Sequence, residues 1–289
     1  MESAADSLIA QLNPKGKKLS KSHQKIADYI EKHYEKAVFL TASALSREVG
    51  VSESTVVRFA SALGYSGYPE LRHTLEETVR HRLTAHQRFD MTADIREDDV
   101  LKTVLKTDMH NIRTTIEEMD QAAFQKAVTM LLSARHIYIL GLRSAAPLAQ
   151  FLGYYLNFIF DNVRVVAAAS NDVYEGIVRM GQGDVLIGIS FPRYSTRTLE
   201  AMRFARRNQA QVLALTDGEM SPLCRESDVC LSARTDMTSF VDSLAAPLSL
   251  INALIIAVGL HKKEELSTHL NRLEGIWSEH RVYLEEQHT

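Results

Sequence analysis

The chain has 289 residues, a formal net charge of −3 and an apolar fraction of 45%. At roughly 100 to 200 residues per domain, this length suggests two domains, and the composition allows a packed core. Two cysteines are too few for a disulfide framework, which indicates a reduced, cytoplasmic protein. Cys224 and Cys230 are expected to be ordinary small apolar side chains. The N-terminus lacks a secretory pattern, and the most apolar stretch, 244–260, is short for a membrane span, so no membrane role is expected.

The N-terminal part of the chain has helical spacing and helix-capping residues. Ser20 precedes a first predicted helix, and Thr41 can cap a second. Gly50 supplies a tight turn, after which Ser52 can cap a third helix that ends at Gly64. This order predicts a helix-turn-helix.

The third predicted helix is a candidate for reading DNA. Its first residues carry short polar side chains that can enter the major groove, and Arg58 can reach a guanine or a phosphate. The segment 15–59 has nine Lys and Arg against five Asp and Glu, which suits a polyanion. Helical hairpins and lysine runs also occur in proteins that bind no DNA, so spacing alone leaves both interpretations open. The candidate DNA-binding residues are Lys17, Lys18, Lys21, Thr41, Ser52, Glu53, Ser54, Thr55 and Arg58.

From residue 122 onward, short apolar runs alternate with amphipathic segments. The predicted strands are 136–140, 163–166, 185–189, 212–215 and 229–231. Alternating strands and helices predict an α/β fold with a doubly wound parallel sheet, and continuous apolar runs fit strands that are buried on both faces. Ligands of such sheets bind at the carboxyl ends of the strands, where the loops here begin at Gly141, Ser190 and Thr216.

Three stretches of the N-terminal part are distinctive: KIADYI at 25–30, GVSESTVVRF at 50–59 and LGYSGYPEL at 63–71. Together they resemble the RpiR family of bacterial regulators. The second half of that family is a sugar isomerase (SIS) domain, which agrees with the separate α/β prediction for the C-terminal part. The resemblance covers nearly the whole chain and is weakest over 84–119. The expected domains are a helix-turn-helix domain over 1–83, a helical linker over 84–121 and a SIS domain over 122–289.

The resemblance implies a DNA-binding transcription regulator, by family default a repressor, whose SIS domain binds a phosphorylated sugar. SIS loops typically read Gly-x-Gly-x-Ser after the first strand and Ser-x-Ser-Gly-x-Thr after the third. This chain reads GLRSA at 141–145 and SFPRYS at 190–195. The backbone cradle is expected to be poorer, because Pro192 lacks an N–H and Arg193 lacks the freedom of glycine.

The two arginines add guanidinium groups that suit phosphate or carboxylate. The expected ligand is a small anionic metabolite such as a sugar phosphate, a sugar acid or a related carbohydrate. Alternatively, the arginines pair with acidic groups within the protein or across a dimer interface. The candidate ligand-binding residues are Arg143, Ser144, Ser190, Arg193 and Ser195.

SIS domains also form sugar phosphate isomerases, which is the alternative function. Isomerisation needs a placed base, for which Glu175 and Glu200 are candidates by position only; Ser243 is expected to face ligand or to cap a helix. The helix-turn-helix favours a regulator, and no catalytic residue, metal site or cofactor is predicted. A homodimer or homotetramer on a palindromic operator is expected, because one small helix-turn-helix buries too little surface for tight binding.

Overall fold

The computed structural model describes residues 18–38, 40–79, 84–90, 95–166 and 173–284. The chain forms two compact units, Met1–Ile95 and Arg96–Thr289, which are treated separately below. The expected linker is divided between them, with α7 (Ala85–Asp90) in the first unit and α8 (Val100–Glu118) in the second.

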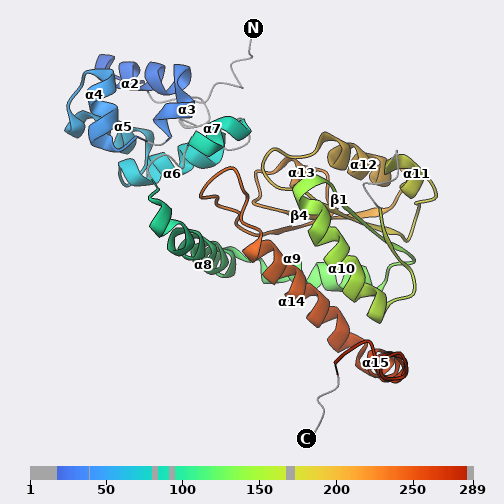
Figure 1. The fold of residues 1–289 in the computed structure, drawn as a ribbon. Helices are drawn as coiled ribbons and strands as arrows, with labels where there is room; N and C mark the ends of the chain where they lie inside the picture. Colours follow the sequence, from blue (N-terminus) through green and yellow to red (C-terminus); the bar gives the residue numbers. More distant parts are fainter. Residues whose placement is uncertain (1–17, 39, 80–83, 91–94, 167–172, 285–289) are drawn as a thin grey trace, which may run out of the picture. The chain divides into compact units, whose positions relative to one another are not determined.

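The described part of the first unit is helical (Figure 1). Before α7 it contains α2 (Lys21–Lys32), α3 (Tyr34–Ala37), α4 (Ala42–Val49), α5 (Glu53–Leu63) and α6 (Tyr68–Val79). The predicted caps form, since the hydroxyls of Ser20, Thr41 and Ser52 accept backbone N–H groups in the first turns of α2, α4 and α5 at 3.2 or 3.3 Å. Gly50 ends α4 in the left-handed conformation, with φ 71°, so the helix-turn-helix of the sequence is present.

The second unit is built on a five-stranded sheet in which every neighbouring pair of strands is parallel, in the order β2-β1-β3-β4-β5. The strands are β1 (Ile137–Gly141), β2 (Val163–Val165), β3 (Val185–Ile189), β4 (Gln211–Thr216) and β5 (Val229–Ser232). This confirms the predicted doubly wound fold. The direction of winding reverses between β1 and β3, which makes the ends of these two strands the expected ligand crevice.

Helices cover both faces of the sheet (Figure 1). One face packs against α9 (Gln121–Leu132), α10 (Ala146–Ile159) and α14 (Ala245–His261). The other packs against α11 (Val173–Ile177), α12 (Thr196–Arg207) and α13 (Pro222–Arg225). In β3, Ile187 faces the first layer and Leu186 the second. Both faces of the strands are therefore buried, which explains their unbroken apolar runs.

The last helix of the described residues is α15 (Lys263–Glu279), which is bent by 103° relative to α14. No single helix of the described residues is long and apolar enough to cross a membrane, and only this bent pair together has the length and composition. Leu250, Leu254 and Val258 of α14 are buried in the core of the sheet unit, which accounts for the apolar character of this helix.

Two glycines allow helices to approach the sheet closely. A β-carbon at Gly188 of β3 would lie 2.7 Å from Met202 Sδ of α12. A β-carbon at Gly153 of α10 would overlap the side chain of Val165 in β2. Close packing at these two points fixes α12 and α10, the helices that follow the two candidate ligand loops.

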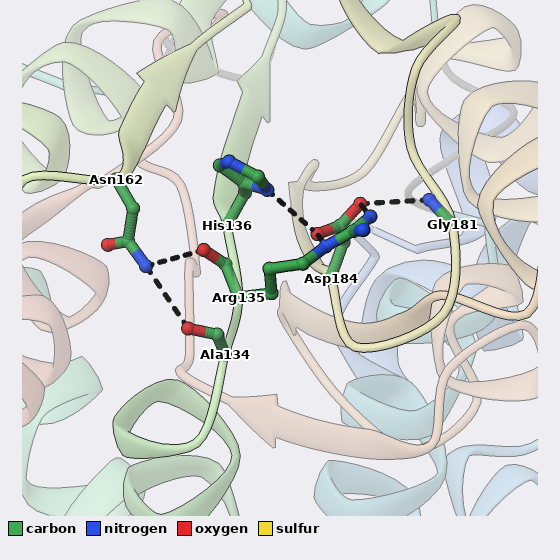
Figure 2. Close-up of polar contacts among 6 residues, drawn as sticks. All are labelled: Ala134, Arg135, His136, Asn162, Gly181 and Asp184. Carbon is green, nitrogen blue, oxygen red and sulfur yellow. Dashed lines mark hydrogen bonds and ion pairs between the residues drawn. The ribbon is translucent and has the colours of Figure 1, made fainter.

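A buried carboxylate joins the amino ends of β1 and β3 (Figure 2). Asp184 has no exposed side-chain surface and accepts bonds from Arg135 Nε and Nη2 at 2.9 and 2.7 Å and from the Gly181 N–H at 2.9 Å. His136 Nδ1 lies 3.1 Å from the same carboxylate. Burial alone would raise the pKa of Asp184, but these hydrogen bonds and the Arg135 charge outweigh it and lower the pKa to about 2. The cluster is structural and lies at the sheet edge opposite to the candidate ligand loops.

Polar side chains fasten α8 to the segment that follows β5. Asn111 is fully buried, and its amide donates to the Asp236 carbonyl at 2.9 Å and accepts from the Asp236 N–H at 3.1 Å. Ser243 donates to Asp108 of α8 at 2.6 Å, and α14 begins without a side-chain cap. Ser243 thus does not cap α14, and its hydroxyl is bonded to α8 instead.

The expectation for the two cysteines is wrong. Cys224 of α13 and Cys230 of β5 form a disulfide, with their Cα atoms 5.2 Å apart. The chain returns from α13 to β5 through a short turn, which brings the two residues within the Cα separation that a disulfide requires.

Candidate functional site

The outer face of α5 is the candidate DNA interface. Val56 and Phe59 are fully buried on the inner side of this helix, whereas Glu53, Ser54 and Arg58 are exposed. The Ser52 hydroxyl caps the helix and lies 2.9 Å from the hydroxyl of Ser54 and 2.8 Å from that of Thr55. The start of α5 therefore presents a compact set of hydroxyl groups, with a guanidinium one turn further on.

Sequence reasoning overlooked Val57 on this same face. Its side chain is 41% exposed, and its methyl groups are suited to contact with the methyl group of thymine. Its position in the sequence, one turn after Glu53 and beside Arg58, could have indicated that Val57 lies on this face. Thr41, Lys18 and Lys21 are also exposed, whereas Lys17 lies outside the described residues.

The turn before α4 is tied to α6 by a buried hydrogen bond. Tyr68 is buried, and its hydroxyl donates to the Leu40 carbonyl at 2.9 Å. Burial raises the pKa of Tyr68 to about 12, so the phenol stays neutral and remains a donor at physiological pH. The helix-turn-helix therefore has a fixed geometry in which the outer face of α5 is held by a packed scaffold.

The candidate ligand site lies where the winding of the sheet reverses. Gly141 at the end of β1 pairs with Ile189 at the end of β3, so the loops that carry the five candidate residues start side by side. A β-carbon at Gly141 would lie 2.6 Å from the Ala145 carbonyl oxygen. Only glycine fits this tight turn, after which Arg143 and Ser144 are exposed in a short 3-10 helix, η3 (Arg143–Ala145).

Hydroxyl groups hold the loop after β3 in shape. Ser190 is buried, and its hydroxyl accepts the Ser195 N–H at 3.0 Å. Ser195 in turn caps α12 by accepting the Thr198 N–H at 3.3 Å. Ser195 thus lies at the start of α12, and Ser190 reaches it from the end of β3. Between them, Arg193 is exposed.

A contact between neighbouring loops was not foreseen from the sequence. Tyr194 donates to Asp217 at 2.8 Å, and Asp217 also accepts from Thr216 at 3.1 Å. Thr216 is bonded in turn to Ser221 at 2.7 Å. The loops after β3 and β4 are therefore linked through the Asp217 carboxylate.

The backbone is left-handed at both arginines. Arg193, which lacks the freedom of glycine, has φ 65°, and Arg143 has φ 58°. The loops thus retain the conformation that glycine favours, even though each carries a long cationic side chain.

The described residues contain no cluster of three or more His, Cys, Asp or Glu side chains that could hold a metal ion. Glu175 and Glu200, the candidate bases of an isomerase, are both exposed on the surfaces of α11 and α12. Neither carboxylate has the buried setting that tunes a general base.

Two family models match the chain. The helix-turn-helix domain of the rpiR family matches residues 7–82, and the SIS domain matches residues 130–257. The chain belongs to the RpiR family of transcriptional regulators. The regulator HexR of Pseudomonas aeruginosa is 29% identical to it over 276 residues, which are 92% of this chain and 94% of HexR.

Two solved structures share this fold. The sugar isomerase domain of an RpiR transcription factor from Sphaerobacter thermophilus has a TM-score of 0.59 and 24% identity, and covers 61% of this chain and 98% of that one. Vibrio vulnificus NanR complexed with ManNAc-6P has a TM-score of 0.59 and 20% identity, and covers 96% of this chain and all of that one (100%). The protein is thus a transcriptional regulator with a helix-turn-helix domain and a SIS domain, as its sequence predicts.

Proposed function

We propose that this RpiR-family regulator is a cytoplasmic repressor that binds a palindromic operator and is controlled by a small anionic carbohydrate bound in its SIS domain. The observation that carries the proposal is the pairing of Gly141 with Ile189. It supports the proposal because the two loops that carry the serines and arginines start side by side, each before a helix, and helix starts favour anions.

The DNA-binding half of the proposal uses the outer face of α5. In the major groove, base edges are contacted by Ser54, Val57 and Arg58, and the DNA phosphates are contacted by Lys18 and Lys21 of the α2 region. One such helix contacts too few bases for tight binding, so two copies bind half-sites about one helical turn, roughly 34 Å, or a multiple apart.

Exposed apolar side chains on the second unit support assembly into a homodimer or homotetramer. On α8, Leu101, Leu105, Met109 and Ile116 are exposed; on α14, Ile256 and Leu260 are exposed. Apolar surface of this extent on a monomer indicates an interface. A second copy of the chain covers it in the proposed assembly, whose mass can be measured by light scattering at micromolar concentration.

A DNA-release assay tests the effector site. Operator duplexes are selected with the full-length protein, and sugar phosphates, sugar acids and polyols are screened by thermal shift and then titrated into the complex. Ser190→Ala should raise the concentration of the active compound needed for release by about tenfold or more. Ser267→Ala, which removes an exposed hydroxyl from α15, is the matched control.

Release from Ser190→Ala at the wild-type concentration would place the effector elsewhere. An isomerase assay on the same compounds addresses the alternative function. Turnover at a rate typical of enzymes would show that the SIS domain is catalytic.

A further inference from the structure

The disulfide between Cys224 and Cys230 closes a short loop within the second unit. The two residues are six positions apart, with Cys224 in α13 and Cys230 in β5. A cross-link over so few residues restricts the unfolded chain little, so it adds less stability than a long-range disulfide. By thermodynamic linkage, the fold protects the bond against reduction only as much as the bond stabilises the fold. A bond that is protected so little is open to exchange with small thiols.

Both cysteines are partly exposed, whereas Leu223, the residue before Cys224, is fully buried. Exchange requires a thiolate to attack one of the two sulfur atoms directly, which depends on access from solvent. A pair at the surface of the unit meets this condition, and a pair in its core would not.

Cys224 has a second partner in the reduced state. Its sulfur lies 3.4 Å from the carbonyl oxygen of Gly218, in the loop after β4. A disulfide sulfur carries no hydrogen, so this contact becomes a hydrogen bond only when Cys224 is a thiol. The side chain is therefore placed for two states, in which it is either bonded to β5 or donates to the loop after β4.

The elements that carry the two cysteines are anchored without the disulfide. β5 pairs with β4 in parallel, and its residues Val229 and Leu231 pack into the core of the unit. α13 is anchored by the buried Leu223 and is capped by Ser221, whose hydroxyl accepts the Leu223 N–H at 3.3 Å. Reduction should therefore leave the unit folded and change how firmly α13 and the loop before it are held.

The loop after β4 connects the disulfide to the loop after β3. Gly218, the alternative partner of Cys224, directly follows Asp217. The Asp217 carboxylate accepts a hydrogen bond from the Tyr194 hydroxyl at 2.8 Å. Contacts of this kind carry coupling when one end of the chain of contacts has two discrete arrangements, as the two states of Cys224 provide.

We propose that Cys224 and Cys230 are a thiol–disulfide exchange site, whose state sets how firmly the loop after β4 and, through Asp217 and Tyr194, the loop after β3 are held. The co-reactants are low-molecular-weight thiols and disulfides. The site is distinct from the effector site of the proposed function, and it requires neither operator nor effector.

The exchange proceeds in two displacement steps. One cysteine thiolate attacks the small disulfide, whose S–S bond breaks, and a mixed disulfide forms as the first small thiolate leaves. The second cysteine thiolate attacks the protein sulfur of this mixed disulfide, which forms the Cys224–Cys230 bond and expels the second small thiolate. The protein loses two electrons, which the small disulfide gains, and the two thiol protons pass through solvent to the released thiolates. Reduction is the reverse.

Counting free thiols in glutathione buffers tests the exchange. The chain has only two cysteines, so alkylation followed by measurement of the intact mass gives an unambiguous count. The folded full-length protein should take up two alkyl groups after treatment with excess reduced glutathione. After transfer to oxidised glutathione it should take up none. Cys224→Ser should instead stop at a mixed disulfide between glutathione and Cys230, because the resolving thiol is absent.

Resistance of the bond in the folded protein, with reduction by glutathione only in denaturant, would show that the disulfide is purely structural and that the proposal is wrong. A reduced pair that oxidised glutathione leaves as two thiols would contradict it equally. Since these assays contain no DNA and no carbohydrate, their outcome is independent of the DNA-release assay that tests the proposed function.

Amide hydrogen exchange of the full-length protein tests the effect on the loops. Reduction should raise exchange rates at least about threefold in 217–223, and in 191–195 as well. The double variant C224S/C230S is the matched control, because it keeps two small side chains and removes the redox chemistry. Its rates should be the same in both buffers. Tyr194→Phe removes the donor to Asp217, so it should confine the response to 217–223.

Equal rates in 217–223 for the oxidised and reduced wild-type protein would overturn the proposed effect on the loops. A response at 191–195 that is missing from the wild-type protein, or that persists in Tyr194→Phe, would overturn the route through Asp217. A response of C224S/C230S as large as that of the wild-type protein would show that the buffer acts elsewhere in the chain, and the proposal would be wrong.

Discussion

Replacing Asn111 by alanine tests how α8 is held on the sheet unit. The side chain is fully buried and makes two hydrogen bonds to the backbone of Asp236, of 2.9 and 3.1 Å. Removing it leaves one N–H and one carbonyl without partners in a partly buried setting. A buried polar group without a partner costs about 1–3 kcal/mol, and less where water can enter. We therefore expect the free energy of unfolding to fall by about 2–4 kcal/mol.

Denaturant unfolding can be followed by Trp277, the single tryptophan of the chain, which lies in α15 of the second unit. Asn271→Ala is the matched control, because it makes the same exchange at an exposed position of a helix. It therefore reports the gain in helix propensity alone. A difference below about 1 kcal/mol between the two variants would refute the reasoning, since it would mean that the Asp236 backbone finds equal partners without Asn111.

Three further predictions concern the DNA interface, the buried carboxylate and the packing of α10. Arg58→Ala should weaken operator binding by about 1–3 kcal/mol. Lys18→Ala should instead weaken binding to all DNA sequences alike, and it should reduce the slope of log affinity against log salt concentration by about one. Fluorescence anisotropy across a salt series separates the two, and unchanged operator affinity in Arg58→Ala would remove it from the interface. Because the pKa of Asp184 is lowered to about 2 from 3.8, its contribution of about 2 kcal/mol is present above pH 4 and is lost as the pH falls toward 2. Asp184→Asn should flatten this part of the pH–stability curve, and an unchanged acid transition would contradict it. Gly153→Ala should destabilise the protein by about 1–3 kcal/mol through overlap with β2, while Gly275→Ala in open space on α15 should be neutral or stabilising in the same melt.

Local signals in the sequence were sufficient for the sheet and the helix caps. The run 185–189 was predicted as a strand and is β3 with the same bounds, because an unbroken apolar run between polar turns fits a strand that is buried on both faces. Ser52 was predicted to cap a helix and does so. The helix after β2 is short, since α11 ends at Ile177, and an amphipathic pattern predicts an element better than it predicts its end.

Features that depend on partners far away in the chain could not be predicted. The face by which α8 packs on the sheet unit includes the buried Asn111, whose partner is 125 residues away, whereas the apolar Leu101 and Met109 of the same helix are exposed. The Asp184 cluster likewise joins residues 48 and 49 positions apart. Periodicity within a window detects burial of apolar side chains, and it does not detect a polar side chain that is buried because a distant backbone satisfies it.

The two ligand loops show where local propensity and the fold disagree. Arginine has no preference for positive φ, so local reasoning predicts that Arg143 and Arg193 alter the loops, yet both take the glycine conformation. The flanking contacts explain this. The turn at Gly141 packs against the Ala145 carbonyl, and Ser190 binds the Ser195 N–H across the second loop. These contacts fix each loop from both ends, so the residue between them has to adopt the backbone that the loop imposes. Departures from local rules concentrate at functional sites. Here the departure adds two positive charges at this end of the sheet and leaves the loop backbone in the conformation that glycine favours.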